Sequence, residues 1–524
     1  MSLAKQPSIS ERSLPVTTGL SEPLPSGRGR RLPHALIAFS LANLFFLPAA
    51  ALLLDNKDHH YYNQTSCLGS ALAALAANIV GLSLLLFGLS RVSRHWSRGF
   101  LSLSRDLAFC CLLLVPLNSL RFFFNLDLGQ FLRLPAVLKV PGLVLALLAL
   151  LGMVRWHRRV ARGAAAFVLI LSPLAFLICG CLVYRLATPA PWTPAPQPPM
   201  VPAKDWTSAP RLLWIIFDEW DQRLALLERP SGIALPELDR LTAESLLATN
   251  AFSPSTLTRN AMPALTTGRI VTNSTPVSDH ELLLAYADSP APVPWSSQPT
   301  VFQRARELGL NVAVVGWYHP YARLFSGAAN YIASYPTGGG IDSCDFSENI
   351  ANQILAGLPT FARREHLSHF QAAFDQVSSL VTNSAFGFIF WHAPIPHDPG
   401  IYDPARKRVS TRQYLKTTGY LGNLILCDEV LGKLRRDLER AHLWDHTWVL
   451  LSADHSLRDE RFGKIDRRVP FILKAPGTNA PIVYSQTLHT VVTKDLLLAI
   501  LRADVRSLPE VSRWLDAHVA PGGG

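Results

Sequence analysis

Charged side chains are scarce in this sequence. Asp, Glu, Lys and Arg make up 17% of its 524 residues, whereas 49% are hydrophobic. A wholly soluble globular chain carries about 25% charged residues, so this composition argues against one. Cysteine is also rare, and seven cysteines in a chain of this length do not make the dense disulfide framework of a small secreted fold. No internal repeat is evident.

Six of the seven cysteines fall into two groups by their surroundings. One group lies within apolar segments, where small buried thiols are ordinary: Cys110, Cys111, Cys179 and Cys181. Cys344 and Cys427 stand in the less apolar second part of the chain, where an oxidising compartment would allow them to pair. The sequence does not bring these two together in space, so their pairing stays open.

The hydrophobic excess is concentrated in the first part of the chain. Uncharged runs of membrane-spanning character cover 35–54, 68–90 and 164–184. Shorter and weaker candidates cover 107–120 and 140–154. The first run begins too late to be a cleaved signal peptide, and other runs follow it. We therefore expect about five transmembrane helices.

Arginines indicate how these helices are oriented. They precede the first run (Arg28, Arg30, Arg31), follow the second (Arg91, Arg94, Arg98) and separate the fourth from the fifth (Arg155, Arg158, Arg159, Arg162). The alternate loops are poorer in Lys and Arg, so we expect the N-terminus inside and everything after residue 185 outside. The net charge of +11 then comes partly from the arginine-rich loops on the cytoplasmic side of the membrane. We therefore interpret it as a sign of membrane orientation and expect no nucleic-acid partner.

Four segments are expected from this pattern. They are a cytoplasmic N-terminal tail (1–34), a transmembrane domain (35–185), a proline-rich linker (186–206) and an extracytoplasmic domain (207–524). Because proline favours extended backbone, the linker is expected to be a semi-rigid tether. It would hold the last domain above the membrane.

The last domain alternates strand-like and helix-like segments. Short apolar runs suited to strands buried on both faces cover 211–217, 311–316, 386–391 and 447–452. Amphipathic stretches such as 300–310 lie between them. The alternation predicts an α/β domain with a mostly parallel central sheet, following an N-terminal α-helical bundle. In such sheets the functional groups gather at the carboxyl ends of the strands.

Polar side chains come directly after these four strands. They are Asp218 and Glu219 after the first strand, His319 after the second, His392, His397 and Asp398 after the third, and Asp454 and His455 after the fourth. One acidic pair after a strand is usually a helix cap, but carboxylates and histidines at four strand ends indicate a metal site. Oxygen and imidazole ligands together suit Zn²⁺ or Mn²⁺, while Mg²⁺ and Ca²⁺ stay open as alternatives.

Across most of residues 211 to 475 the sequence resembles the alkaline-phosphatase superfamily, in its sulfatase-like branch. The matching segments, in chain order, are LLWIIFDEW, LPELDRLTAES, ATNAFSPSTLTRNAMPALTTGR, LGLNVAVVGWYHP, WHAPIPHDP, SADHS and RVPFILKAPG. Each match alone is weak, and their order and spacing carry the resemblance. It implies metal ligands at Asp218, Glu219, Asp454 and His455, with Asp218 favoured over Glu219 as the inner ligand of that pair.

The resemblance also implies a nucleophile in the loop AFSPSTLTRNAMPALTTGR. In sulfatases the nucleophile precedes the Thr of the closing Thr-Gly by nine residues, and in membrane-anchored phosphoethanolamine transferases a Thr precedes a proline by five. Counting back from Thr267 and from Pro263 gives Thr258 both times. Thr256 is the second choice, and the neighbouring serines are expected to be turn and cap residues.

Departures from the family narrow the substrate. Thr258 cannot become the formylglycine of sulfatases, which needs Cys or Ser, and Trp317 stands where they place a sulfate-binding Lys, although His319 is kept. The five-residue spacing of His392 and His397 is that of the phosphoethanolamine transferases. It implies that His397 binds or protonates the phosphoryl group, while His392 is expected to be structural or to line the substrate site.

Arg467 stands where those transferases carry a further histidine, so a second zinc site is doubtful. Arg467 or its neighbour Arg468 is instead a candidate phosphate contact, although an arginine before a strand is more often simply solvated.

The resemblance implies a multi-pass protein of the bacterial inner membrane with a periplasmic catalytic domain. The preferred function is transfer of phosphoethanolamine or phosphoglycerol from a membrane phospholipid donor, through Thr258, to an envelope glycan or lipid acceptor. One alternative is a membrane-tethered hydrolase of phosphate or sulfate esters. Another is a non-catalytic envelope protein that keeps the fold. The oligomeric state stays open.

Overall fold

The structure, a computed structural model, describes most of the chain. The described residues are 31–54, 60–62, 67–93, 99–114, 135–188, 195–337, 341, 344–355, 359–412 and 416–518. Most of the expected tail lies outside them, as do residues 115–120 of the third expected span and 189–194 of the expected linker.

Helices make up the first part of the chain, in which the strong helix formers Leu and Ala predominate. They are α1 (Arg31–Phe45), α2 (Leu47–Leu54), α4 (Leu68–Val92), α5 (Gly99–Leu112), α8 (Ala136–Arg155), α9 (His157–Ile170) and α10 (Ser172–Ala187). Two helices among the described residues, Leu68–Val92 and Val137–Arg155, are long and apolar enough to cross a membrane. The number rises to four if α1 with α2, and α9 with α10, each form one bent span.

These four candidates coincide with four of the five apolar runs. The fifth run, 107–120, overlaps the end of α5 and then passes outside the described residues. The bends of 63° between α1 and α2 and of 43° between α9 and α10 each fall just before a proline, Pro48 and Pro173. Proline cannot donate the backbone hydrogen bond that would continue the preceding helix, so a break at these two points is expected.

Eight strands form the central sheet of the second part, in the order β14-β2-β13-β12-β1-β9-β7-β8. Their bounds are β1 (Arg211–Asp218), β2 (Leu246–Ala248), β7 (Val312–Trp317), β8 (Tyr331–Tyr335), β9 (Phe388–Pro396), β12 (Thr447–Ala453), β13 (Phe471–Lys474) and β14 (Ile482–Tyr484). Only β13 runs antiparallel to its neighbours. The four strands expected from the sequence and the mostly parallel sheet are therefore confirmed.

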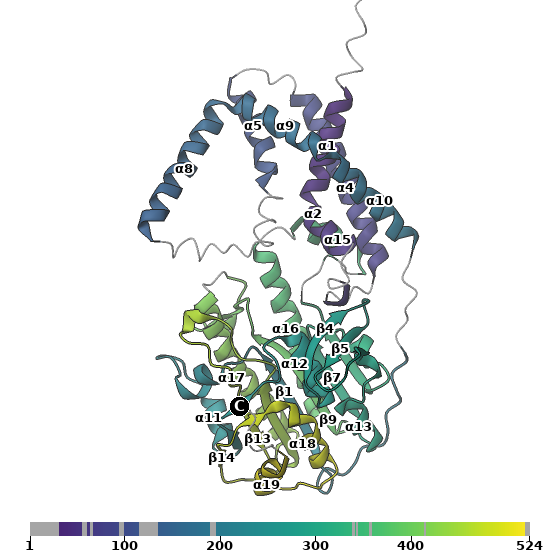
Figure 1. Ribbon diagram of the computed structural model, residues 1–524, viewed down its shortest axis with the longest axis vertical. Helices are drawn as coiled ribbons and strands as arrows, with labels where there is room; N and C mark the ends of the chain where they lie inside the picture. The colour runs from purple at the N-terminus through teal and green to yellow at the C-terminus, as the bar shows by residue number, and fades with distance from the viewer. Residues whose placement is uncertain are drawn as a thin grey trace, which may run out of the picture.

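Two groups of helices cover the sheet, one on either side (Figure 1). One group is α11 (Pro236–Thr242), α16 (Pro359–Thr382) and α17 (Lys416–Arg440), and the other is α12 (Thr258–Thr267), α13 (Val301–Glu307) and α18 (Thr493–Leu501). Every side chain of β1 is buried between them, as its apolar run LLWIIF (212–217) requires. This burial makes β1 a rigid support for the polar residues at its carboxyl end.

Shorter elements surround this core. The helices are α14 (Tyr321–Leu324), α15 (Phe346–Leu355) and α19 (Leu508–His518). The strands are β3 (Ala251–Phe252) with β15 (Leu488–His489), β4 (Val271–Pro276) with β5 (Leu282–Tyr286) and β6 (Val293–Pro294), and β10 (Tyr402–Asp403) with β11 (Arg408–Val409).

The helical part and the α/β part contact each other directly. Figure 1 shows α15 beside α4, and Gln353 of α15 accepts a hydrogen bond from Asn78 of α4 at 3.0 Å. A disulfide joins Cys67, just before α4, to Cys344, just before α15. Pairing of Cys344 with Cys427, which the sequence left open, is therefore wrong, because Cys427 is buried within α17 and is not disulfide-bonded.

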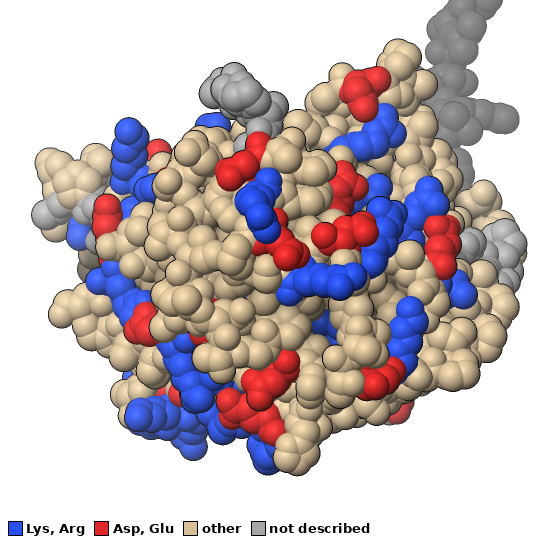
Figure 2. Space-filling view, turned by 90° about the horizontal axis from the view of Figure 1, so that it is seen from below, with Lys and Arg blue, Asp and Glu red and all other residues tan. Residues whose placement is uncertain are grey.

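The surface at the far end of the α/β part carries charges of both signs. Figure 2 views this end and shows Lys and Arg interspersed with Asp and Glu.

Candidate active site

Three ligand atoms converge at the carboxyl ends of neighbouring strands. Asp218 ends β1, His392 lies in β9 beside Ile216 of β1, and Asp454 comes directly after β12. Because β12, β1 and β9 are adjacent in the sheet, these side chains meet at one edge. One ligand atom from each of the three lies within 4.8 Å of the other two, and all three side chains are buried.

The unused hydrogen-bonding atoms of this cluster fit a cation. Among the described residues, Asp218 Oδ1, His392 Nε2 and Asp454 Oδ2 are buried atoms that have no hydrogen-bond partner. The companion oxygens are satisfied, since Asp218 Oδ2 accepts from Trp317 Nε1 at 2.9 Å and Asp454 Oδ1 accepts from the backbone N–H of His455 at 2.8 Å. Buried carboxylate oxygens without a partner are costly, and a divalent ion would satisfy all three atoms at once.

His392 is prepared to be a ligand by its neighbours. Its Nδ1 lies 3.1 Å from the carbonyl oxygen of Trp317, which can only accept, so Nδ1 carries the proton. Burial lowers the pKa of His392 to about 4, which keeps the ring neutral. Nε2 therefore presents a lone pair to the two carboxylates, as in metal-binding histidines held by a backbone carbonyl. The sequence-based interpretation of His392 as a structural residue overlooked this arrangement.

The two buried carboxylates influence each other's ionisation. Burial, and then the proximity of Asp454, raise the pKa of Asp218 to about 7. Burial also opposes ionisation of Asp454, but His455 and His392 outweigh it and lower the pKa of Asp454. Without a cation this pair favours holding a proton, whereas a bound divalent ion would favour both carboxylates in the ionised form.

Thr258 lies beside the cluster at the start of α12. Its Oγ1 is 3.2 Å from His455 Nε2, and that nitrogen is 3.4 Å from Asp454 Oδ2 and 3.9 Å from Asp218 Oδ1. His455 Nδ1 lies 2.9 Å from the carbonyl of Ser456, so its proton is on Nδ1 and Nε2 can accept from the Thr258 hydroxyl. The positive end of the α12 dipole favours negative charge on this oxygen.

Side-chain contacts support the loop before α12 and the first turn of the helix. Pro263 lies inside α12 and cannot donate to the carbonyl of Arg259, which instead accepts from Ser274 Oγ at 3.0 Å. The Ser253 hydroxyl donates to the Asp454 carbonyl, a contact between distant segments, whereas Ser255 Oγ accepts from the backbone N–H of Leu257 at 3.2 Å within the turn. Thr256 is exposed on the loop.

Glu219 lies at the rim rather than in the three-atom cluster. It has φ +63°, and its Oε2 is 3.9 Å from His397 Nε2 while its Oε1 accepts from the backbone N–H of Arg458 at 3.4 Å. The exposed fractions of the three side chains rise from 12% for Glu219 through 31% for His397 to 40% for Arg458. The cluster is therefore open to solvent on this side.

Two residues of the expected site lie elsewhere. His319 is fully buried behind α12, with Nε2 3.4 Å from the Thr258 carbonyl and Nδ1 3.0 Å from the hydroxyl of Tyr61. Arg467 is exposed, and the adjacent Arg468 pairs with Asp466. The arginine that contacts the rim is Arg458, two residues after Ser456, which sequence reasoning missed although it lies close to the SADHS segment.

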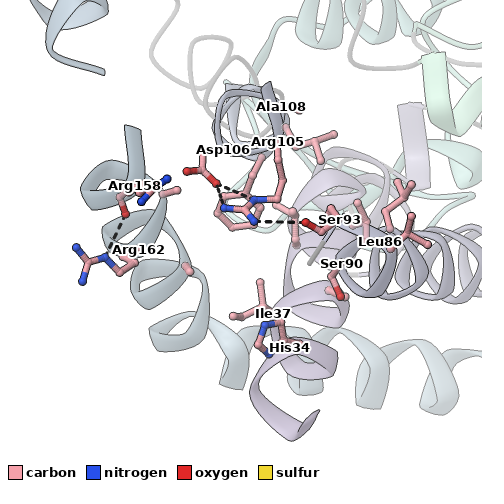
Figure 3. Close-up of a pocket in the computed structure, with 18 residues that line it drawn as sticks. His34, Ile37, Leu86, Ser90, Ser93, Arg105, Asp106, Ala108, Arg158 and Arg162 are labelled. Atoms are coloured by element: carbon pink, nitrogen blue, oxygen red, sulfur yellow. Dashed lines mark hydrogen bonds and ion pairs between the residues drawn. The ribbon is translucent and has the colours of Figure 1, made fainter. Parts of the chain in front are cut away.

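A separate cavity of about 640 Å³ lies in the helical part. Its lining residues come from α1, α4, α5 and α9, and Figure 3 shows Arg105 paired with Asp106 at one side of it. His157 Nδ1 also lies 2.7 Å from Asp106. It contains none of the residues of the expected catalytic site.

Comparison with known proteins agrees with this geometry. The sulfatase family model matches residues 210–503, which contain every member of the cluster and Thr258. No significant match is found among curated proteins.

Similar solved structures include the PsFucS1 sulfatase from Pseudoalteromonas sp. (13% identity, 56% of this chain, 68% of that chain, TM-score 0.42). Others are the lipoteichoic acid synthase LtaP from Listeria monocytogenes (14%, 56%, 72%, 0.39) and the phosphonate monoester hydrolase of Agrobacterium radiobacter (12%, 60%, 79%, 0.39). These values do not discriminate between reactions. The family model covers more than half of the sequence, and the chain therefore belongs to the sulfatase family.

Proposed function

We propose that this chain is an integral membrane, metal-dependent phospho-group transferase. It moves a phospholipid headgroup, phosphoethanolamine or phosphoglycerol, to a cell-envelope glycan or lipid through a phosphothreonine intermediate. The observation that carries the proposal is the Thr258 hydroxyl, 3.2 Å from His455 Nε2 and beside the buried atoms of Asp218, His392 and Asp454 that have no other partner.

The residue types favour phosphorus over sulfur. Thr258 cannot supply formylglycine, and a sulfate ester on threonine has no easy route of release, whereas a phosphodiester stays open to a second in-line attack. Trp317, where sulfatases carry a lysine that binds sulfate, turns its indole N–H to Asp218 Oδ2 at 2.9 Å and so supports the cluster instead.

In the first half-reaction Thr258 is the nucleophile. Its proton passes to His455 Nε2, the oxygen attacks phosphorus, and the bond from phosphorus to the diacylglycerol oxygen breaks. A divalent cation held by Asp218, His392 and Asp454 would supply Lewis acidity that favours the threonine alkoxide and screens the phosphoryl oxygens. His397 donates the proton that the departing diacylglycerol oxygen needs. Glu219 Oε2 lies 3.9 Å from His397 Nε2, and its negative charge would stabilise the protonated ring.

In the second half-reaction the acceptor replaces diacylglycerol. Its hydroxyl gives a proton to His397, now a base, and its oxygen attacks phosphorus, while Thr258 recovers its proton from His455. Water in place of the acceptor would give the hydrolase. The helices long and apolar enough to span a membrane favour transfer, because a hydrolase of soluble esters has no need of them.

The membrane setting is part of the same proposal. The helices α1 to α10 would anchor the chain in the bacterial inner membrane as a multi-pass protein, with the α/β part in the periplasm. The Glu219, His397 and Arg458 rim would then receive a phospholipid donor.

Release of labelled diacylglycerol from phosphatidylethanolamine or phosphatidylglycerol vesicles tests this function. We expect the full chain with Zn²⁺ or Mn²⁺ to be active, and Thr258→Ala to lower turnover at least about 1,000-fold because the nucleophile is lost. Thr256→Ala, on the same loop but exposed, is the matched control and should keep normal turnover. Cleavage of aryl sulfates without action on phospholipid would contradict the proposal, and normal turnover of Thr258→Ala would contradict the nucleophile.

A further inference from the structure

We propose that Tyr61, from the N-terminal helical part, is a positioning residue that acts through His319 on Thr258. The inference rests on the proposed role of Thr258 as nucleophile. It goes beyond that role by assigning part of the active-site geometry to a residue outside the sulfatase-family region, which begins at residue 210.

A continuous chain of contacts connects the two residues. The Tyr61 hydroxyl lies 3.0 Å from His319 Nδ1, and His319 Nε2 lies 3.4 Å from the carbonyl oxygen of Thr258. Tyr61 and His319 are both fully buried, and Thr258 is 6% exposed. The contacts are thus made away from bulk water, where a hydrogen bond orients its partners most strongly.

The chemistry of the three groups fixes the direction of each hydrogen bond. A backbone carbonyl only accepts, so His319 Nε2 carries the proton that is donated to Thr258. Burial keeps the His319 ring neutral, since it lowers its pKa to about 3. Nδ1 is then an acceptor, and the Tyr61 hydroxyl is the donor that selects this tautomer. A Phe at 61 would leave Nδ1 without this donor.

Thr258 is the residue whose orientation this chain of contacts controls. It is the first residue of α12, so its carbonyl belongs to the first turn of the helix and its side chain faces His455. Anchoring the carbonyl from behind the helix fixes the direction of the Thr258 Cα–Cβ bond. A displacement of the nucleophile by about 1 Å is enough to cost a large factor in rate.

Tyr61 is held at this position by the packing around residues 60–62. Its neighbour Tyr62 packs on Tyr318, with ring centroids 4.7 Å apart, and its carbonyl accepts from the backbone N–H of Thr337 at 3.3 Å. Tyr318 has φ +73°, a strained conformation that bulky residues rarely adopt and that the surrounding structure must maintain. The Cys67–Cys344 disulfide ties the segment after Tyr62 to the α/β part. The helical part is therefore an integral component of the active site.

The test is a double-mutant cycle on the full-length protein in phospholipid vesicles. Tyr61→Phe and His319→Leu should each lower kcat about 10-fold or more and change KM less than about twofold, because the nucleophile is misplaced while the binding rim is intact. The double variant should be no slower than His319→Leu alone. His319→Gln, which keeps one donor and one acceptor, should be markedly faster than His319→Leu. The matched control is Tyr184→Phe, in α10 and 67% exposed, which should have normal kcat.

A normal kcat for Tyr61→Phe, or independent effects of Tyr61→Phe and His319→Leu, would overturn the positioning role. If the wild type cleaves aryl sulfates and not phospholipid, the proposed function fails, and the same cycle on the aryl sulfate still decides the role of Tyr61. A cycle on the midpoint of thermal unfolding requires no substrate. The shifts caused by Tyr61→Phe and by His319→Leu should not add up in the double variant, and additive shifts would contradict the contact between Tyr61 and His319.

Discussion

At the scale of single residues, the candidate site depends on where buried polar atoms lack partners. Asp218 Oδ1, His392 Nε2 and Asp454 Oδ2 lie close together and buried at the carboxyl ends of three central strands. Among the described residues, none of these three atoms has a hydrogen-bond partner. Such an arrangement without a cation would cost several kcal/mol. The residue pattern alone indicated a metal site made of carboxylates and histidines. Only the geometry shows that His392, and not Glu219, lies with Asp218 and Asp454 in the three-atom cluster.

His392 provides the residue-scale prediction. His392→Ala should weaken Zn²⁺ binding to the full chain about 100-fold, because a neutral imidazole nitrogen is lost from the cluster. Isothermal titration calorimetry measures the change. His489→Ala, an exposed histidine, is the control and should bind Zn²⁺ normally. Unchanged affinity of His392→Ala would return His392 to a structural role.

At the scale of elements, the strands and their polar carboxyl ends could be predicted from local sequence. β1, β7, β9 and β12 are apolar runs bounded by polar residues, and their burial on both faces leaves a signal that does not depend on distant contacts. The bends within the two helix pairs are harder to predict from the sequence. A proline inside an apolar run can also be accommodated without a sharp bend, so its presence alone does not predict one.

Contacts between distant elements could not be predicted in this way. The contact of Tyr61 with His319 and the pairing of Cys67 with Cys344 join residues separated by 258 and 277 positions. Neither has a periodic or compositional signal, because Tyr61 lies between the first two apolar runs, in a stretch whose only sequence feature was its low content of Lys and Arg. Such pairings arise from the docking of the helical part on the α/β part, which local sequence does not encode.

Lys474, at the end of β13, provides an element-scale prediction of pH dependence. The fully buried ammonium donates to the Trp444 carbonyl at 2.9 Å, and burial lowers the pKa of Lys474 to about 8. The unfolded chain keeps this proton up to about pH 10.4, so between the two values the unfolded state binds more protons and stability rises with pH. From pH 7 to pH 9.5 this residue should add about 2 kcal/mol to the free energy of unfolding.

Denaturant unfolding of the wild type and of Lys474→Met at both pH values isolates this effect. The free energy of unfolding should rise by about 2 kcal/mol more in the wild type than in Lys474→Met between the two pH values, because the other titrating groups are common to both proteins. A wild type whose pH dependence equals that of Lys474→Met would show that the lysine is charged at neutral pH without penalty.

At the scale of the whole molecule, the helical part and the α/β part are joined by more than the linker. In the proposed membrane setting, the Cys67–Cys344 disulfide would place the residues just before α4 and the α/β part on the same, oxidising side of the membrane. This placement agrees with the orientation inferred from the arginines, which places the residues after 185 outside.

Cleavage of the linker tests this arrangement. A protease site introduced at residues 195–197 should yield two fragments that migrate together on non-reducing gels and separate after reduction. Cys344→Ser should separate without reductant and serves as the control. Separation of the wild-type fragments without reductant would contradict the disulfide and the shared side.

The phosphothreonine intermediate is tested most sharply by mass spectrometry of the full-length protein after incubation with Zn²⁺ and phospholipid. We predict a phosphoethanolamine or phosphoglycerol adduct on the peptide that contains Thr258, located on Thr258 itself by fragmentation and missing in Thr258→Ala. An adduct on Thr256, or turnover of phospholipid with no adduct on Thr258 even when the acceptor is withheld, would contradict this intermediate.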